Sequence, residues 1–320
     1  MKTDWYKSMN DPQTTSHILM VRPSSFGFNT DTAMSNVFQA APIHQQAAQI
    51  SLEATKEFDE LVHTLVRAGI QVMVVEDTPQ PVKPDAVFPN NWFTTHSDGT
   101  FITYPMQAPN RRAERREDIV TLLEASYQIK NRYSFEHDEQ DGKILEGTGS
   151  MILDRKNKLV YACLSPRTNP ELLERFALIR QYEKIVFNAF DPQGIPVYHT
   201  NVIMALGEDI AVVCMSAIRD ENEKKMLLEA IGRTEKKLVD LSWEQVLNFA
   251  GNMIQLRDKE NHLIWVMSES ARSSLTPDQL LMLRASGDIL SSPIPTIEKY
   301  GGGSVRCMIA EIFLPVKKPK

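Results

Sequence analysis

A short pattern recurs along this chain at nearly constant intervals: an Asn or Ser that is followed directly by hydrophobic residues. The pattern begins at Asn91, Ser150, Asn201, Asn252 and Ser304, and the successive intervals are 59, 51, 51 and 52 residues. A period of this length indicates one supersecondary unit that is repeated along the chain. We therefore predict a fold that is built from five copies of one unit.

Stretches of helical character lie between the repeated positions. They cover residues 49–68, 111–127, a segment that begins at Asn169-Pro170, residues 220–233, and a segment that begins at Thr276-Pro277. Their apolar residues recur at helical spacing, and Asn or Thr followed by Pro is typical of a helix start. Shorter β-rich stretches follow the helices at 70–75, 184–187, 237–239 and 294–297. The repeated unit is therefore predicted to be strand, turn, strand, helix, strand.

The strands that begin each unit are predicted to form hairpins. Two examples join 151–153 to 159–161 and 202–206 to 210–215. The first strand, 17–21, has no repeat of its own, and we expect it to pair near 305–313 and so close the chain into a ring. No linker rich in Pro, Gly or Ser divides the sequence, so residues 1–320 are expected to form a single α/β domain.

The composition is that of a soluble globular protein, with 42% hydrophobic and 24% charged residues. The net charge of -6 argues against nucleic-acid binding, and the basic end at 317–320 is more typical of a solvated terminus. No apolar run approaches the ~20 residues that cross a membrane, and residues 1–5 lack the apolar segment of a signal peptide. Three scattered cysteines are too few for a disulfide framework, so we expect a cytoplasmic protein.

Four reactive side chains lie within a few residues of the repeated positions: Asp85, Glu146, His199 and Cys307. A repeat that brings two carboxylates, an imidazole and a thiol to equivalent places indicates one shared centre. The other histidines have no metal-ligand spacing, and the sequence contains no CxxC or HxxxH motif. The sequence therefore predicts no metal site.

Cys307 and His199 are the candidate nucleophile and base. Three glycines at 301–303 precede Cys307 in a predicted strand, and glycines permit tight turns and the close approach of a ligand. A nucleophilic cysteine needs a nearby histidine or a positive field. The alternatives are that Cys307 is a small core residue and that His199 is structural. The glycines and the repeat favour a Cys–His pair.

Asp85 and Glu146 are single acids among apolar and small residues. Taken one at a time, Asp85 could cap a turn and Glu146 could face solvent. Two carboxylates that converge on a Cys–His pair would instead suit a cationic, planar substrate, because a guanidinium group pairs with carboxylates in a bidentate manner.

Arg111, Arg112 and Arg167 lie at predicted helix N-termini. The helix dipole disfavours cations there by roughly a few tenths of a kcal/mol each. A bound carboxylate would relieve that conflict. The alternative is a surface arginine that is paired with Glu114 or Glu171. For Arg111 and Arg112 the two interpretations are equally supported, whereas a substrate-binding role is favoured for Arg167.

The order Asp85, Glu146, His199, Cys307 resembles that of the guanidino-group-modifying enzymes: arginine deiminase, dimethylarginine hydrolase and the amidinotransferases. The resemblance covers nearly the whole chain from Val21-Arg22-Pro23 onward. It implies the pentein fold, a five-bladed α/β propeller of ββαβ repeats around a central active site.

Individual segments narrow the resemblance. Residues 108–112 and 165–169 are similar to the segments of dimethylarginine hydrolases whose arginines hold the carboxylate of the substrate. The blocks 20–23, 36–39 and 90–93 are closer still to a bacterial amidinotransferase-like subgroup that is linked to citrulline use.

The resemblance implies a cofactor-free hydrolase that cleaves a linear C–N bond of a guanidino or ureido amino acid of the arginine, methylarginine or citrulline type. Cys307 would attack the central carbon, and His199 would protonate the leaving amine and then activate water. Asp85 and Glu146 would orient the head group. No metal or organic cofactor is implied.

The chain departs from the arginine deiminases and amidinotransferases at one position. They have His-x-Asp where this chain has His199-Thr200-Asn201. Our hypothesis is that the neutral Asn201 donates a hydrogen bond to a ureido C=O and so favours citrulline over arginine. The alternative is that Asn201 caps a hairpin, as Asn91 and Asn252 would do at equivalent places. The fourth repeated position, at Gly251-Asn252, brings no obvious catalytic group.

Two other functions compete with hydrolysis. An amidinotransferase would pass the covalent intermediate to an amine, and a non-catalytic propeller would act as a binding protein. The expected partner is a small-molecule substrate, while assembly into a homo-oligomer is left open. The segment Phe26-Gly27-Phe28-Asn29 is a candidate lid, because aromatic residues next to glycine can move and exclude water. An ordinary surface loop is the alternative.

Overall fold

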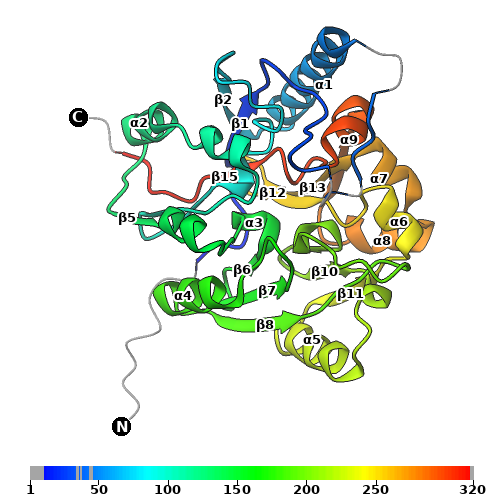
Figure 1. Cartoon of the computed structure of the whole chain (residues 1–320). Coiled ribbons are helices and arrows are strands. Elements are labelled where there is room, and N and C mark those ends of the chain that lie inside the picture. Colours follow the sequence, from blue (N-terminus) through cyan, green and yellow to red (C-terminus); the bar gives the residue numbers. More distant parts are fainter. Residues whose placement is uncertain (1–10, 34–35, 37, 43–45, 318–320) are drawn as a thin grey trace.

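Five small sheets of three strands each make up the described β-structure. The computed structural model describes residues 11–33, 36, 38–42 and 46–317 (Figure 1). In every sheet the first two strands are antiparallel and the third is parallel to the second. The sheets are β15-β1-β2, β3-β4-β5, β6-β7-β8, β9-β10-β11 and β12-β13-β14. One pairing pattern thus occurs five times, which confirms the repeat.

The strands are short, and their bounds follow the predicted units closely. They are β1 (His17–Arg22), β2 (Gln71–Glu76), β3 (Phe93–Thr95), β4 (Thr100–Thr103), β5 (Asn131–Ser134), β6 (Ile152–Asp154), β7 (Leu159–Cys163), β8 (Glu183–Phe187), β9 (Met204–Leu206), β10 (Ile210–Val213), β11 (Lys237–Asp240), β12 (Ile254–Arg257), β13 (Leu263–Ser268), β14 (Asp288–Ser292) and β15 (Ala310–Glu311). Both hairpins that were singled out from the sequence form, as β6–β7 and β9–β10.

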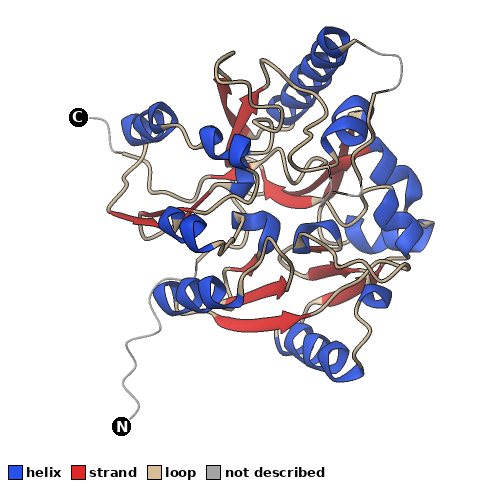
Figure 2. Cartoon of the chain, viewed as in Figure 1, coloured by secondary structure: helices blue, strands red, loops and turns tan. Residues whose placement is uncertain are grey.

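Helices connect the second strand of each sheet to the third, and Figure 2 shows the longer ones around the outside of the molecule. These helices are α1 (Ala47–Arg67), α2 (Glu117–Ser126), α4 (Pro170–Arg180), α5 (Glu221–Arg233) and α8 (Pro277–Arg284). Shorter helices also occur at α3 (Gly147–Ser150), α6 (Trp243–Leu247), α7 (Glu269–Ser274) and α9 (Pro295–Gly301). The predicted order of strand, turn, strand, helix, strand is therefore confirmed.

Local chemistry explains where the helices begin. Asn169 accepts hydrogen bonds from the backbone N–H groups of Glu171 and Leu172, and Pro170 occupies the first turn of α4. Thr276 and Gln279 form a capping box at the start of α8. Apolar residues on one side of each long helix are buried against the strands; in α1 these are Ile50, Ala54, Phe58, Leu61 and Leu65.

The first and last described strands meet in one sheet. β15 pairs antiparallel with β1, with Ile18 opposite Glu311 and Leu19 opposite Ala310. The hydroxyl of Thr95, in β3, donates to the carbonyl of Glu311 at 2.9 Å and accepts from the N–H of Phe313 at 2.8 Å. The first strand thus completes the last unit, as predicted, and the last unit is joined to the second sheet.

The first strands of the sheets surround the centre of the molecule. Residues of β6, β9, β12 and β15 line a small cavity of about 30 Å³, which is enclosed by Gln13, Thr148, Ile152, Leu153, Ala205, Leu206, Met253, Ile254, Gln255, Arg306 and Glu311. Four first strands therefore meet at one axis, and β3 contacts β15 beside them. This arrangement is that of an α/β propeller, so the predicted fold class is confirmed.

Three local predictions were wrong. Residues 294–297 are not a strand, because the third strand is β14 and Pro295 begins α9, a position in which a proline needs no N–H partner. Residues 111–127 are not one helix, because Arg115 and Arg116 are extended between a 3-10 helix at Pro109–Glu114 and α2. Cys307 does not lie in a strand but in a helical turn that precedes β15.

Val37, within the block 36–39, and residues 1–5 and 318–320 lie outside the described residues. No helix in the described part of the chain is long and apolar enough to cross a membrane.

Candidate active site

A turn lies at each repeated position, helical at 89–91, 147–150 and 200–202, and neighbouring turns are hydrogen-bonded to one another. The hydroxyl of Thr148 donates to the carbonyl of Asn90 at 3.3 Å, and that of Thr200 donates to the carbonyl of Ser150 at 2.6 Å. The amide of Asn252 donates to the carbonyl of Asn201 at 2.9 Å. The turns at 89–91, 147–150, 200–202, 251–252 and 304–308 therefore form a connected series that carries the candidate residues.

Glycines allow the turns to approach one another this closely. A Cβ on Gly147, whose φ is +45°, would lie 2.4 Å from the carbonyl oxygen of Asn90. A Cβ on Gly149 would lie 2.5 Å from Asn91 Nδ2 and 2.8 Å from His199 Nδ1. The two glycines after Glu146 thus serve the packing of one turn against the next.

Glu146 and His199 form a buried hydrogen-bonded pair. Nε2 of His199 lies 2.7 Å from Oε2 of Glu146, and the two side chains are 4% and 0% exposed. Glu146 also accepts a hydrogen bond from the backbone N–H of Gln107 at 2.9 Å. Since Nε2 faces the carboxylate, Nδ1 is the nitrogen that is left for proton transfer to a substrate.

The pKa values of this pair move in the same direction. Burial acts to raise the pKa of Glu146, but the positive charge of Arg167 and the hydrogen bond from His199 outweigh it, and the pKa lies well below its usual range. Burial lowers the pKa of His199 to about 4, despite the opposing effect of Glu146. At neutral pH the pair therefore consists of a carboxylate and a neutral imidazole.

Asp85 lies in the turn that precedes the 3-10 helix at Pro89–Asn91. Its Oδ2 accepts a hydrogen bond from Nδ2 of Asn29 at 2.7 Å, and Nε of Arg111 is 3.6 Å away. Its Oδ1 is buried and has no hydrogen-bond partner among the described residues. Burial raises the pKa of Asp85, against the lowering effect of Arg111. A cationic ligand at Oδ1 would compensate this buried acid.

Cys307 lies in the turn at 304–308, in which its own N–H donates to the carbonyl of Ser304 at 3.0 Å. The side chain is largely buried, and its sulfur accepts hydrogen bonds from two amides: Nδ2 of Asn201 at 3.3 Å and Nδ2 of Asn252 at 3.2 Å. Both amides come from other repeated positions. Asn252 is a site residue that the sequence interpretation missed, although its place in the repeat was a signal.

Tyr198 links His199 to the segment that leads to Cys307. Its hydroxyl donates to the carbonyl of Gly302 at 2.9 Å, and its ring packs against that of His199 with centroids 4.9 Å apart. Together with Asn201, three residues further along, Tyr198 brings the His199 turn and the Cys307 turn into contact.

Arg111 is fully enclosed and pairs with Glu114 through two bonds, Nε to Oε1 at 2.8 Å and Nη2 to Oε2 at 2.9 Å. Its Nη1 also donates to Oδ1 of Asn91 at 2.9 Å. Arg111 therefore does not lie on the surface, and it contacts Asp85 rather than solvent. The pairing with Glu114 is the alternative that the sequence left open.

The other two arginines differ in exposure. The side chain of Arg167 is 3% exposed; its Nη1 lies 3.4 Å from Oε2 of Glu146, and its guanidinium group lies over the ring of Tyr198. The side chain of Arg112 is 37% exposed and lies 3.1 Å from Oε2 of Glu139. Arg167 thus belongs to the buried charge cluster, whereas Arg112 lies at a more exposed position.

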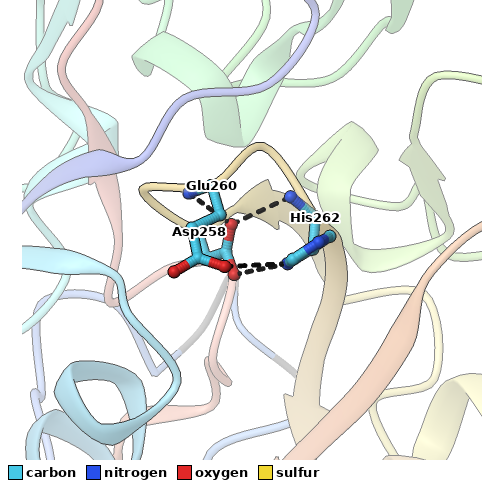
Figure 3. A group of neighbouring side chains, drawn as sticks. All are labelled: Asp258, Glu260 and His262. Atoms are coloured by element: carbon cyan, nitrogen blue, oxygen red, sulfur yellow. Dashed lines mark hydrogen bonds and ion pairs between the residues drawn. The ribbon is translucent and has the colours of Figure 1, made fainter.

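The structure also brings together Asp258, Glu260 and His262, in the turn between β12 and β13 (Figure 3). Oδ1 of Asp258 accepts hydrogen bonds from the backbone N–H groups of Glu260 and His262, at 2.8 and 2.9 Å. Glu260 and His262 are exposed. The hydrogen bonds of Asp258 stabilise the turn, and the turn accounts for the proximity of the three side chains.

The five repeated units have the architecture of the α/β-propeller class of guanidino-group-modifying enzymes. The sequence matches the family described as "N,N dimethylarginine dimethylhydrolase, eukaryotic" over residues 22–314. The chain belongs to this family, whose members are hydrolases that act on C–N bonds in linear amidines. Among curated proteins, no sequence matches this chain.

Solved structures of related fold support the architecture. The N-terminal domain of ArgZ, an arginine dihydrolase from the ornithine–ammonia cycle in cyanobacteria, has a TM-score of 0.72 at 17% identity, over 93% of this chain and 98% of that domain. Unliganded AgrE has a TM-score of 0.72 at 17% identity, over 94% of this chain and 40% of AgrE. A dimethylarginine dimethylaminohydrolase adduct with S-methyl-L-thiocitrulline has a TM-score of 0.63 at 13% identity, over 93% and 100%.

The chain spans less than half of full-length ArgZ and AgrE, 41% and 40% respectively. At sequence identities of 13% to 17%, the structural similarity between these proteins and this chain shows a shared fold.

Proposed function

We propose that the chain hydrolyses a C–N bond of a guanidino amino acid through a covalent intermediate on Cys307. The observation that supports the proposal is the connected series of turns, on or beside which Cys307, the Glu146–His199 pair and Asp85 lie, in a chain that belongs to a family of amidine hydrolases. The substrate is a small molecule, and the proposed reaction requires no organic cofactor.

Two unpartnered acceptors support recognition of a guanidino head group. Oδ1 of Asp85 and Oδ1 of Asn201 are buried and have no hydrogen-bond partner within the described structure. A guanidinium group offers several N–H donors in one plane and a positive charge. It would satisfy both oxygens, and its charge would favour the ionised form of Asp85.

The first half of the proposed reaction forms the covalent intermediate. The sulfur of Cys307 attacks the central guanidino carbon and gives a tetrahedral adduct. As the sulfur attacks, His199 takes the thiol proton on Nδ1 and then delivers it to one amino group, which leaves as ammonia or, from a methylated substrate, as an amine. The C–N bond breaks and an amidino group stays bonded to sulfur, while Glu146 stabilises the protonated imidazole during the transfer.

The second half consumes water. His199, now neutral, takes a proton from a water molecule as its oxygen attacks the amidino carbon. Collapse of this adduct breaks the C–S bond and leaves a ureido product, and the sulfur of Cys307 takes the proton back from His199, which restores the starting state. One water is consumed, and one amine is released for each turnover.

The ureido product is a second candidate substrate because of Asn91. Its Nδ2 is buried without a hydrogen-bond partner among the described residues, close to Nδ1 of His199 across Gly149. A guanidinium offers no acceptor for this N–H, whereas a ureido C=O does. Our hypothesis gave this role to Asn201, but the Nδ2 of Asn201 is directed at Cys307. We therefore assign the ureido donor to Asn91.

The amino-acid part of the substrate would be held by arginines. We propose that Arg112, which is partly exposed, meets the substrate carboxylate. Arg167 contributes positive charge beside Glu146, and Arg111 holds Asp85 in place.

Ammonia release from purified full-length protein tests the proposal. The panel contains arginine, methylated arginines, agmatine and citrulline, with dimethylamine and methylamine measured for the methylated compounds. We expect release from at least one guanidino amino acid, no release by Cys307→Ser, and unchanged release by the matched control Cys163→Ser. Full activity of Cys307→Ser would exclude the covalent mechanism.

Addition of glycine or ornithine separates hydrolysis from amidino transfer. A hydrolase gives the same ureido product with or without the added amine, whereas an amidinotransferase gives a new guanidino compound. Binding of arginine without turnover of any compound in the panel would instead support the non-catalytic binding protein.

A further inference from the structure

Asn252 binds the turn that carries Cys307 through both ends of its amide. Oδ1 accepts hydrogen bonds from the N–H of Ser304 at 3.2 Å and from that of Cys307 at 3.3 Å. Nδ2 lies 3.2 Å from the sulfur of Cys307 and donates to the carbonyl of Asn201 at 2.9 Å. The side chain is only 2% exposed, so solvent is excluded from these contacts.

Asn201 approaches the same sulfur from the neighbouring turn. Its Nδ2 is 3.3 Å from Sγ, and its side chain is completely buried. Two amide N–H groups from consecutive repeated positions are therefore directed at one sulfur atom. N–H donors stabilise an anionic acceptor more than a neutral one, and neutral amides do so without adding a charge to the site.

We propose that Asn252 and Asn201 form a two-donor cradle that stabilises the anionic sulfur of Cys307 and fixes its direction of attack. This inference rests on the proposed function, since it takes Cys307 to be the nucleophile. The proposed cradle gives Asn252, at the fourth repeated position, a role in the chemistry. All five repeated positions then contribute to one site, and Asn252 contributes through its contact with the sulfur of Cys307.

The two halves of the Asn252 amide can be tested separately. In Asn252→Asp, one carboxylate oxygen still accepts from Ser304 and Cys307, which maintains their turn. The other oxygen replaces the N–H donor, so the bonds to the sulfur and to the carbonyl of Asn201 are both lost, and an anionic sulfur is repelled. Asn201→Asp is a second, independent variant. Because Oδ1 of Asn201 has no partner in the described structure, that variant loses only the bond to sulfur.

Alkylation of Cys307 by iodoacetamide reports on the sulfur without any substrate. The second-order rate constant is measured from pH 5 to 10 on the full chain, and the label is mapped by mass spectrometry. We expect both variants to react at least about tenfold more slowly than wild type at pH 7, with profiles displaced to higher pH, because each loses a charge-assisted hydrogen bond. The matched control Asn248→Asp, at an exposed position, should react like wild type.

The other groups around the sulfur stay constant in this comparison. Arg306, which adjoins Cys307 in the turn, Tyr198, which bonds the carbonyl of Gly302, and the proposed site residues His199, Glu146 and Asp85 are the same in the wild type and in the variants. Unchanged alkylation profiles in both variants would overturn the cradle. If Asn252→Asp does not fold, Asn201→Asp decides alone.

Turnover measurements distinguish a failure of the cradle from a failure of the proposed function. Slow alkylation and a lower kcat with little change in KM support the cradle. Unchanged alkylation together with an inactive Cys307→Ser rejects the cradle and leaves the proposed function intact. An active Cys307→Ser rejects the proposed function itself.

Discussion

The interaction of Glu146 with His199 illustrates how burial sets the charge of single residues. In water a carboxylate and an imidazole near neutral pH would often both be ionised. Here burial lowers the pKa of His199 to about 4, while Arg167 keeps Glu146 ionised. The histidine therefore enters the reaction neutral and becomes charged only when it takes a proton, and the adjacent carboxylate stabilises that charge.

This assignment predicts how stability depends on pH. The unfolded chain protonates His199 near pH 6.5, whereas the folded chain resists protonation down to about pH 4, so folding loses stability as pH falls through this window. Glu146, whose pKa is lowered, stays ionised throughout the window and loses its contribution only at lower pH. Between pH 7 and 5, wild type should lose about 2 kcal/mol more than His199→Gln, by the linkage relation.

Urea unfolding of both proteins at the two pH values measures this difference. The other histidines titrate in both proteins and cancel. Parallel losses in the wild type and in His199→Gln would show that His199 titrates normally in the folded state.

Arg111 and Arg112 are adjacent in sequence but differ in environment. Arg111→Ala would leave Glu114 and Asp85 as buried charges without their cation, which should cost about 3–5 kcal/mol of stability. Arg112→Ala removes a partly exposed pair and should cost less than about 1 kcal/mol. Chemical denaturation of the two variants gives both values. Similar losses for both would contradict the assigned environments.

At the level of elements, the turns could be predicted only in part. The spacing of Asn and Ser located all five, because a repeated unit places equivalent residues at a constant period. The spacing did not reveal their helical conformation, nor that Gly147, Gly149 and Gly251 serve close packing between turns. Those contacts join residues that are 49 to 58 positions apart, and a local pattern contains no information about them. For the same reason, the contact between Asn252 and Cys307 could not be predicted from the sequence pattern.

Gly251 provides a direct test of this packing. A Cβ at this position would lie 2.2 Å from the backbone oxygen of Val202, which cannot move without displacing the turn at 200–202. Gly251→Ala should therefore lose about 2 kcal/mol or more. Gly232→Ala is the matched control, since it lies in α5 with no atom within 4 Å, and it should gain about 0.5–1 kcal/mol from helix propensity. Equal changes in stability for Gly251→Ala and Gly232→Ala, measured by thermal or urea unfolding, would show that a methyl group fits between the turns at 200–202 and 251–252.

At the level of the whole molecule, the pairing of β15 with β1 makes the last unit depend on both ends of the chain. The sequence predicted this closure because one strand had no unit of its own. Which units face one another across the centre could not be predicted from one sequence, since it depends on the geometry of the complete ring. The five-unit architecture was predictable, while the central contacts were not.

Thr95 tests the coupling between the last unit and its neighbour. Thr95→Val preserves shape but removes the hydroxyl that bonds both Glu311 and Phe313, and leaves their buried backbone groups unpaired. We expect a loss of about 2 kcal/mol, with one cooperative unfolding transition as in wild type. Thr121→Val, at an exposed position of α2, is the control and should change little. A separate early transition in Thr95→Val would show that the last unit unfolds independently.

The central claim is that Cys307 is the nucleophile of an amidine hydrolase, and mapping of the covalent intermediate tests it most directly. The full chain is mixed with a turned-over substrate, quenched in acid and digested, and the peptides that contain each of its three cysteines are analysed by mass spectrometry. Cys163 and Cys214 are completely buried, and burial raises the pKa of Cys163 to about 11. We predict an amidino adduct, with the mass of the substrate less its leaving amine, on Cys307 alone. Continued turnover with no adduct on Cys307, or an adduct on either of the other two cysteines, would contradict the account.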